Sequence, residues 1–179
     1  MEFGTPVKLP DGRYYLKITG ESVYFQLSKI DVQSLSRDLS IQLTEAQQEA
    51  IRKYEEEILA KAKASSQDWF GREVTPAAID KAFYSSLTDG KFDVKMATAK
   101  GEVVTKVFGA DKQPKAMDEV SGKVDLIVEL SGVYFFKKSF GPIFRVIQVK
   151  ESGSVSKKVP AEYMFQDDED EEDPNDYLD

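Results

Sequence analysis

An aromatic and basic segment, "VYFFKKSFGPIFR" at residues 133–145, has the residue types that bind single-stranded nucleic acid. A protein holds a single strand with cations along the phosphates and with flat rings on which the bases stack. The segment supplies five aromatic side chains within eleven residues, with three cations nearby. Five such rings cannot all face water, so we expect Phe144 and one of Phe135 and Phe136 to belong to the core. The predicted contacts are Tyr134, Phe135, Lys137, Lys138, Phe140 and Arg145.

Further candidates lie on the polar sides of predicted strands. Two segments near the N-terminus and two in the middle of the chain alternate apolar residues with tyrosine or lysine. Successive strand residues point to opposite faces, so these side chains are expected to be exposed or partly covered. For each lysine alone, an ordinary solvated surface is the more frequent explanation. The additional candidates are Tyr15, Lys17, Tyr24, Lys91, Lys95 and Lys106.

The end of the chain, "QDDEDEEDPNDYLD", is strongly acidic. Residues 167–179 alone carry a charge of −9, whereas the other 166 residues hold 24 basic and 23 acidic groups, a charge of +1. Residues 91–158 hold 13 basic and 8 acidic groups, a charge of +5. This asymmetry favours a polyanion-binding half and an interaction tail, with a solvated surface and a solubilising tail as the alternative. We expect a disordered tail whose partner-binding or autoinhibitory residues are Asp167, Asp168, Glu169, Asp170, Glu171, Glu172, Asp173, Asp176, Tyr177 and Leu178.

The composition excludes several kinds of chemistry. The chain has no cysteine and no histidine, which removes disulfides, Cys/His zinc sites and imidazole catalysis. It also lacks a glycine-rich phosphate-binding loop, and we expect neither a cofactor nor a metal. Its apolar runs are far shorter than a membrane-spanning helix requires. The N-terminal "MEFGTPVKLP" lacks the features of a signal peptide, so we expect a soluble intracellular protein.

One loose pattern could support catalysis. Metal-dependent nucleases of the PD-(D/E)XK kind hold Mg²⁺ with carboxylates on neighbouring strands and use a lysine to steady the attacking water or the phosphate. Asp125, Gln148 and Lys150 resemble this order, but the usual second acid is a glutamine here. Asp125 also lies in an alternating segment, where an outward polar residue is the ordinary explanation. We expect no enzyme and keep the nuclease as a third hypothesis.

The first half of the chain predicts strands and then helices. Alternation in "GRYYLKITG" and "ESVYFQLSKI" predicts two strands, and the link at residues 20–22 suggests a hairpin between them. Apolar residues at helical spacing predict an amphipathic helix over residues 45–64, and Thr44 with Gln47 forms a capping box before it. "SSQDWFGREV" ends that helix. A shorter helix is expected after Thr75, because a proline follows at the first helical position.

The second half returns to strand patterns. Asp-Gly and Lys-Gly pairs mark turns before "KFDVKMA" and "EVVTKVF". "KVDLIVEL" and "IFRVIQVKE" predict two more strands. Residues 131–132 are expected to end the first of these, which makes "VYFFKKSFGP" a connection. Many short strands with one helical insertion favour a mainly β fold, namely a five-stranded OB-type barrel with an inserted amphipathic helix and a short second helix.

The composition also suggests boundaries along the chain. Residues 1–11 are expected to be an N-terminal extension, in which "EFGT" has the composition of a cloning scar. Residues 12–151 would form the barrel domain, with the helical insertion at about 44–86. A Ser/Gly/Lys-rich linker follows at 152–166, and the acidic tail occupies 167–179.

The block "GKFDVKMATAKGEVVTKVFGADKQPKAMDEVSGKVDLIVELSGVYFFKKSFGPIFRVIQVKE", with the acidic tail, resembles a known family. This family comprises the OB-fold single-stranded-DNA-binding replication proteins of short-tailed phages such as the T-odd coliphage, and relatives in large nucleocytoplasmic DNA viruses. The shared features include a "D-x-x-x-K-x-M-x-x-V" loop, a long strand ending in glycine, an aromatic-basic turn and a final strand. "SFGPIFRVIQVK" is most similar to the viral branch.

The resemblance implies a function for these features. The barrel would hold single-stranded DNA in a basic, aromatic-lined groove, to which the resemblance adds Lys112 and Lys115 of the loop. The tail would contact polymerase, helicase or primase, and would occupy the groove when DNA is absent. A homodimer, as in the phage relatives, is compatible with the sequence. The phage proteins end on an aromatic residue, whereas Tyr177 is third from the end here.

Together these features predict a sequence-independent single-stranded-DNA-binding protein. It would serve viral or phage DNA replication, recombination and repair in the host nucleus or cytoplasm. The alternative is an OB-like interaction module or chaperone whose acidic tail binds basic proteins.

Overall fold

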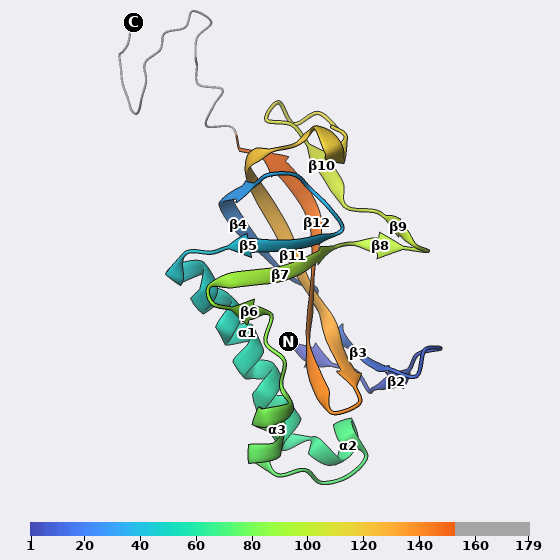
Figure 1. Cartoon of the computed structure of the whole chain (residues 1–179). Helices are drawn as coiled ribbons and strands as arrows, with labels where there is room; N and C mark the ends of the chain where they lie inside the picture. The colour runs from blue at the N-terminus through green and yellow to red at the C-terminus, as the bar shows by residue number, and fades with distance from the viewer. Residues whose placement is uncertain (153–179) are drawn as a thin grey trace, which may run out of the picture.

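The computed structural model describes residues 1–152 of the 179-residue chain. This part is mainly β, with one large sheet, a small two-stranded sheet and helices along one side and at one end (Figure 1). The strands are β1 Glu2–Phe3, β2 Val7–Lys8, β3 Tyr14–Thr19, β4 Val23–Val32, β5 Asp38–Gln42, β6 Leu87–Thr88, β7 Lys91–Met96, β8 Thr98–Ala99, β9 Glu102–Val103, β10 Lys106–Phe108, β11 Gly122–Phe136 and β12 Ser139–Glu151. The helices are α1 Glu45–Ala64, α2 Ser66–Phe70, α3 Pro76–Ala82 and a short 3-10 turn at Met117–Glu119.

β11 and β12 form a long antiparallel hairpin that runs through the middle of the molecule (Figure 1). Phe136 pairs with Ser139, so the turn consists of Lys137 and Lys138 alone. Alternate side chains of both strands point into the core, as the strand period requires. The buried residues of the hairpin include Val124, Leu126, Val128, Leu130, Val133, Phe140, Phe144, Val146 and Val149.

The strand predicted from "KVDLIVEL" does not end at Ser131–Gly132. β11 continues to Phe136, so "VYFFKKSFGP" is the tip of the hairpin and the predicted connection is wrong. The pairing register with β12 shifts at Ser131–Gly132, which indicates a β-bulge. At Gly132, the Leu16 carbonyl and the Tyr15 ring occupy the space that a Cβ atom would need. The Ser-Gly pair therefore accommodates the close approach of β3 instead of ending the strand.

β3 and β4 do not form the predicted hairpin. Both pair antiparallel with β11, β3 opposite Gly132–Phe135 and β4 opposite Gly122–Leu130. The two strands therefore follow one another along the same edge of β11, with Gly20 at φ 78° between them. An alternating pattern identifies a strand and the face that it buries. The pattern does not change with the strand that pairs beside it, so it cannot identify that partner.

β5, β6, β7 and β10 extend the sheet on the β12 side, whereas β1 and β2 pair with β3 at the other end. The path β1-β3-β11-β12-β7-β5 is mixed, because β7 and β10 pair parallel with β12. Asp89–Gly90 joins β6 to β7, and Lys100–Gly101 joins β8 to β9. All four residues have positive φ, as type I′ hairpin turns require, so the predicted turns are confirmed.

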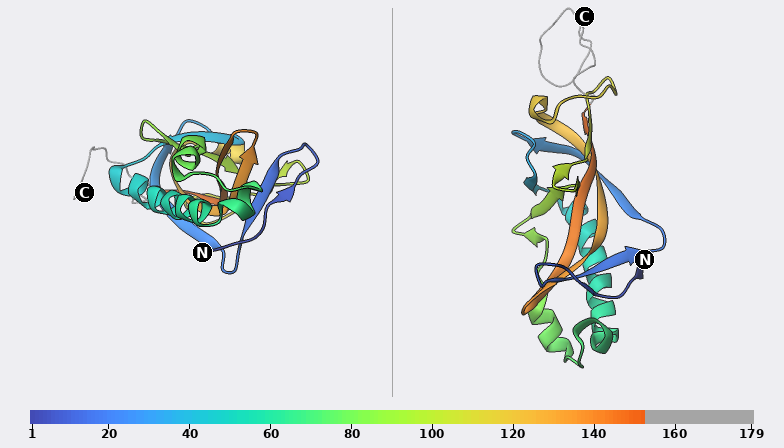
Figure 2. Two further views of the ribbon diagram at one scale, coloured as in Figure 1. Left: turned by 90° about the horizontal axis from the view of Figure 1, so that it is seen from below. Right: turned by 90° about the vertical axis from the view of Figure 1, so that its right-hand side faces the viewer.

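The sheet is strongly curved but is not closed into a barrel within residues 1–152 (Figure 2). β4 pairs with β11 and β5 pairs with β7, and no described ladder joins β4 to β5. The observed strands and helices nevertheless confirm the predicted mainly β fold with an inserted amphipathic helix.

α1 has the predicted bounds and the predicted capping box. The Thr44 hydroxyl accepts from the Gln47 backbone N–H at 3.2 Å, and the Gln47 side chain accepts from the Thr44 N–H at 2.9 Å. Ile51, Ile58 and Ala62 are buried on one face of the helix, as its apolar spacing predicts.

The second predicted helix is α3, and α2 was not predicted. In α3 the Thr75 hydroxyl accepts from the Ala78 N–H, and proline occupies the first helical position. α2 covers five residues of the segment taken to end α1, buries Trp69 and ends at Gly71 with φ 75°. A helix this short has no periodic signal of its own, so its packing against the core must stabilise it.

We expect Thr44→Ala to lower the free energy of unfolding by about 1 kcal/mol, because the substitution leaves an N-terminal amide of α1 without its acceptor. Urea unfolding followed by circular dichroism would measure the change. Thr44→Ser keeps the hydroxyl and serves as the control. Equal stability of the alanine and serine variants would contradict a stabilising role of the cap.

The N-terminal residues are part of the fold. Glu2 and Phe3 pair with Thr19 and Ile18, and the Phe3 ring lies 5.4 Å from that of Trp69. β1 and β2, which lie in the predicted N-terminal extension, therefore add two short strands to the sheet beside β3. Among residues 1–152, no helix has both the length and the apolar character needed to cross a membrane. The predicted linker beyond Ser152 and the acidic tail lie outside the described residues.

Candidate nucleic-acid interface

The side of the large sheet that faces away from the core brings together half of the predicted contacts. Tyr15 lies opposite Tyr134 in the β3–β11 pairing. Further along β11, Glu129 lies opposite both Tyr24 and Arg145. Since cross-strand partners point to the same side of a sheet, these side chains share one surface. We call this surface the outer face, and its predicted members are Tyr15, Lys17, Tyr24, Lys95, Lys106, Tyr134 and Arg145.

Two tyrosines and an arginine form an aromatic corner at the β3 end of the outer face. The rings of Tyr15 and Tyr134 lie 5.5 Å apart, and the Arg13 guanidinium lies 4.8 Å from the centre of the Tyr134 ring. The Tyr15 hydroxyl donates to the Ser131 carbonyl at 3.0 Å. Burial raises the pKa of the Tyr15 phenol above its ordinary value. The corner is therefore a fixed aromatic surface beside a cation.

Arg13 was missed by the sequence analysis. Its guanidinium also donates to Asp11 at 2.7 Å, and this hydrogen bond lowers the pKa of the Asp11 carboxyl and raises that of Arg13. Asp11 therefore holds Arg13 in place over Tyr134. The sequence contained no signal for this contact, because it depends on the pairing of β3 with a strand more than a hundred residues away.

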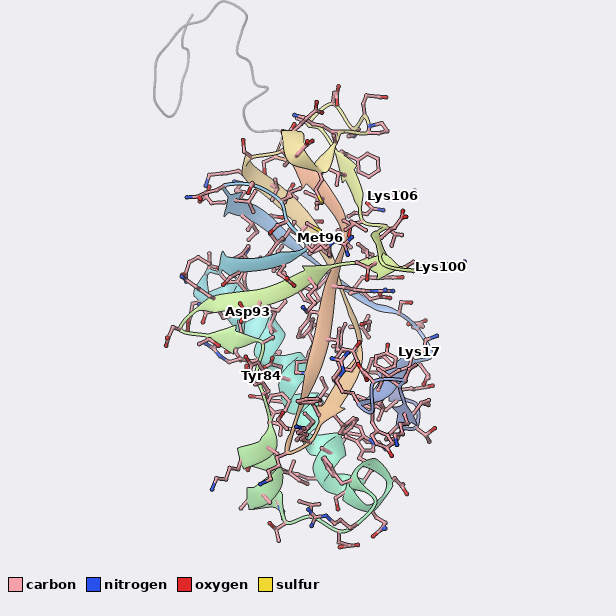
Figure 3. All side chains as sticks on the ribbon, turned by 45° about the vertical axis from the view of Figure 1, so that its right-hand side comes forward. Lys17, Tyr84, Asp93, Met96, Lys100 and Lys106 are labelled. Atoms are coloured by element: carbon pink, nitrogen blue, oxygen red, sulfur yellow. The ribbon has the colours of Figure 1, made fainter. Side chains whose placement is uncertain are left out.

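The cations of the outer face divide into two kinds. Arg145 donates to Glu129 at 2.7 Å, and Lys95 lies 2.9 Å from Asp38, so acidic neighbours offset both charges. Lys17 and Lys106 are exposed, and neither forms an ion pair within residues 1–152. Figure 3 shows both on the same side of the molecule, together with Lys100 at the β8–β9 turn. These lysines are available to an anionic ligand.

Three other predicted cations lie at the margin of the outer face or away from it. Lys91 is exposed on the same side of β7 as Lys95, but at the far end of that strand from its pairing with β12. Lys112 and Lys115 belong to the loop between β10 and β11. Lys115 donates to Glu151 at 2.7 Å and is partly buried, whereas Lys112 is exposed. The loop therefore offers one exposed cation instead of two.

Lys137 and Lys138 are exposed at the β11–β12 turn, as predicted. Two of the aromatic rings that were predicted to stack on bases, however, point into the core. Phe140 is only 2% exposed. Phe135 is partly buried, and its ring packs on Phe140 at 5.9 Å. Both point inward because the bulge in β11 sets which residues of the tip face the core. Phe135 and Phe140 are therefore removed from the site, while Phe144 is buried as expected.

Phe136 is the exposed ring of the tip, and the list of predicted site residues omitted it. Half of its surface is exposed, and the Lys137 ammonium lies 5.5 Å from the centre of its ring. One of the two adjacent phenylalanines was expected to be core, and Phe135 was named as the contact. The structure has the opposite arrangement, which the sequence did not reveal because the local context of the two residues is nearly the same.

The residues of the nuclease hypothesis form an ordinary polar cluster. Asp125 and Lys150 are cross-strand partners whose charged atoms lie 3.8 Å apart. The Asp125 carboxylate also accepts from the Lys29 backbone N–H at 3.0 Å and from the Ser152 hydroxyl at 3.1 Å. Within residues 1–152, no group of three or more acidic side chains could hold a metal ion together. The predicted tail residues, from Asp167 to Leu178, lie outside the described part of the chain.

Comparison with known proteins places the chain in a family. Neither a search of curated proteins nor a search of solved structures finds a match. One family model, described as "Family of unknown function (DUF5871)", matches residues 28–167. The match contains the three α-helices and the whole β11–β12 hairpin, whereas Tyr15, Lys17 and Tyr24 precede it. The chain therefore belongs to the family DUF5871.

Proposed function

We propose that the protein binds single-stranded DNA without sequence preference through the outer face. The observation that carries this proposal is the aromatic corner of Tyr15 and Tyr134 beside Lys17, with Lys106 further along the same side of the sheet. Rings that stack on bases and cations that bind phosphates are the two requirements of such a site. Tyr24, which is 52% exposed, adds a third ring on the same surface.

Single strands suit this surface better than a duplex. Stacking on a tyrosine ring needs the flat face of a base, which neighbouring base pairs cover in a double helix. The two offset cations, Lys95 and Arg145, contribute hydrogen-bond donors with little net charge, because Asp38 and Glu129 accompany them. The net attraction would therefore come mainly from Lys17, Lys106 and Lys100, with the rings supplying the preference for unpaired bases.

The proposed role is non-enzymatic and belongs to viral or phage DNA replication, recombination and repair. It rests on the resemblance of residues 90–151 and the tail to the phage and viral single-stranded-DNA-binding proteins. An OB-type barrel is part of the same proposal. Its closure would have to join β4 and β5, which follow each other directly in the chain and are each paired on one edge alone in the described residues.

The acidic tail would serve as the partner-binding segment. Its nine carboxylates could compete with DNA phosphates for the exposed lysines, and Tyr177 and Leu178 would provide apolar contacts with a polymerase, helicase or primase. This part of the proposal rests on the charge of the sequence and on the resemblance to the phage and viral proteins.

Fluorescence anisotropy of labelled oligo(dT) and of a duplex of equal length, each at several salt concentrations, tests the proposal. We expect oligo(dT) to bind more tightly than the duplex, with an affinity that falls steeply as salt rises. Deleting residues 167–179 should raise the affinity at low salt, because a competing polyanion is removed. Equal affinity for both DNA forms, or none at low salt with or without the tail, would contradict single-strand binding.

A second candidate function is an interaction module whose tail binds basic proteins, and the charge of −9 over residues 167–179 favours it. The same deletion separates the two candidates. A basic-protein binder would lose its histone binding with the tail and would not bind oligo(dT) in either form.

A further inference from the structure

The tip of the β11–β12 hairpin carries an exposed ring between the outer face and two cations. Phe136 is 50% exposed, and Lys137 and Lys138 are both exposed in the turn. We call these three residues the hairpin tip. Figure 1 shows it at the end of the molecule beside α2 and α3, opposite the end that carries β10.

The inner side of the hairpin tip is firmly anchored. Phe135 lies edge-on to Trp69 at 5.7 Å and to Phe70 at 5.6 Å, and it stacks on Phe140 at 5.9 Å. Phe83 packs on the other side of Phe140 at 5.3 Å. This aromatic cluster fixes the direction of the two strands at the tip, so the exposed ring needs little ordering when a ligand binds.

Both residues of the turn are lysines, whereas two-residue hairpin turns favour glycine, asparagine and aspartate. Lys137 has φ 52°, a left-handed conformation that glycine or asparagine adopts more readily. The Ser139 hydroxyl donates to the Phe136 carbonyl at 3.3 Å and helps to close the turn. The result is a tight turn whose two side chains are both positively charged, directly next to an exposed ring.

The hairpin tip continues the aromatic corner of the outer face. Tyr134 and Phe136 are two residues apart in β11 and therefore point to the same side of the sheet, about 7 Å apart along the strand. Tyr134 in turn contacts Tyr15. The rings thus form a row that runs from β3 to the end of the hairpin.

We propose that the hairpin tip is a base-stacking site, in which Phe136 stacks on one nucleobase of a single strand and Lys137 and Lys138 bind the adjoining phosphates. The inference rests on the proposed function and extends the interface from the outer face to the end of the hairpin. An anionic membrane surface is the other ligand that an apolar and basic tip could contact. It fits less well, because Phe136 is the one large apolar side chain that the β11–β12 hairpin itself exposes in the described residues, and membrane binding scales with the apolar area that is buried.

Replacing Phe136 tests the stacking contact. Phe136→Ala should weaken oligo(dT) binding roughly 5- to 100-fold, the range for loss of one stacked base. The dependence of affinity on salt should stay the same, because no charge is lost, and Phe136→Trp should restore binding. Tyr84→Ala, which removes a ring that is 67% exposed and that Figure 3 shows on the opposite side of β12 from Lys17, is the matched control. Thermal unfolding of each variant separates lost stacking from lost stability.

Replacing the two lysines tests the phosphate contacts. Lys137→Gln with Lys138→Gln should reduce the slope of log affinity against log salt by about 1.4, which is about 0.7 for each phosphate contact to a single strand. Lys29→Gln with Lys53→Gln, which makes the same charge change on β4 and α1, should leave the slope nearly unchanged.

The outcomes distinguish this site from the proposed function. If the unmodified protein fails to bind oligo(dT), both the proposed function and the stacking site are overturned. If it binds, but Phe136→Ala binds equally well, the stacking site alone is overturned. Loss of binding to vesicles of anionic phospholipid, with oligo(dT) binding unchanged in Phe136→Ala, would assign the tip to a membrane surface and would also overturn the stacking site.

Discussion

Replacing Lys17 and Lys106 together by glutamate is expected to weaken oligo(dT) binding on the order of 100-fold at low salt. Each lysine lies on the outer face without an acidic partner among the described residues, so each is free to contact a phosphate. A charge pair at about 4 Å contributes about 1 kcal/mol in water, and reversal both removes the attraction and adds a repulsion. Screening by salt reduces the total, so the effect of the double variant should shrink as salt rises.

Fluorescence anisotropy across a salt series would measure this effect. The matched control is Lys53→Glu with Lys81→Glu, which changes the net charge equally but places the new carboxylates on α1 and α3. We expect the control to bind within a few-fold of the unmodified protein. The same loss in both double variants would show that net charge governs binding and that the outer face does not.

The largest expected effect on stability comes from Glu55, a buried acidic residue of α1. Its carboxylate accepts from the Ser85 hydroxyl at 2.7 Å, the Ser86 N–H at 2.8 Å and the Ser86 hydroxyl at 2.6 Å. These bonds attach α1 to the segment that leads into β6. Glu55→Ala should lower the free energy of unfolding by about 3–5 kcal/mol, because it leaves the buried Ser86 donors without an acceptor.

Thermal and urea unfolding would measure this change, and the midpoint temperature should fall by roughly 10 °C. Glu56→Ala is the matched control, since it removes an exposed carboxylate one position along the same helix and should cost less than about 0.5 kcal/mol. Glu55→Gln keeps an acceptor and should lie between the two. If Glu55→Ala and Glu56→Ala have the same midpoint temperature and the same free energy of unfolding, the buried cluster does not stabilise the fold as inferred.

Local sequence patterns predicted the helices and strands of this fold better than they predicted which strands pair with one another. Thr44 and Gln47 define the start of α1 because a capping box involves neighbours in the chain. Alternation correctly placed Leu16 and Ile18 in the core. The pairing of β3 and β4 with different parts of β11 was not predictable in the same way, since alternation contains no information about the partner strand.

The site shows the same limit more sharply. Phe135 and Phe136 are adjacent and identical in type, yet one packs on Trp69 and the other is exposed. The choice depends on the bulge at Ser131–Gly132, where β3 approaches too closely for a Cβ atom at residue 132. A single-residue change of register exchanges the two faces of a strand, so composition identified the segment but not the ring that faces solvent.

The sequence by itself determined the mainly β character, the amphipathic helix, the absence of cysteine and histidine chemistry, and the opposite charges of the body and the tail. These properties follow from residue type and from spacing within a few turns of chain. Only the tertiary structure decided which cations have an acidic partner that offsets their charge, and which aromatic rings are exposed. Lys95 meets Asp38, and Arg145 meets Glu129, across strands that the fold brings together, so the net charge of the outer face depends on pairings that no local pattern contains.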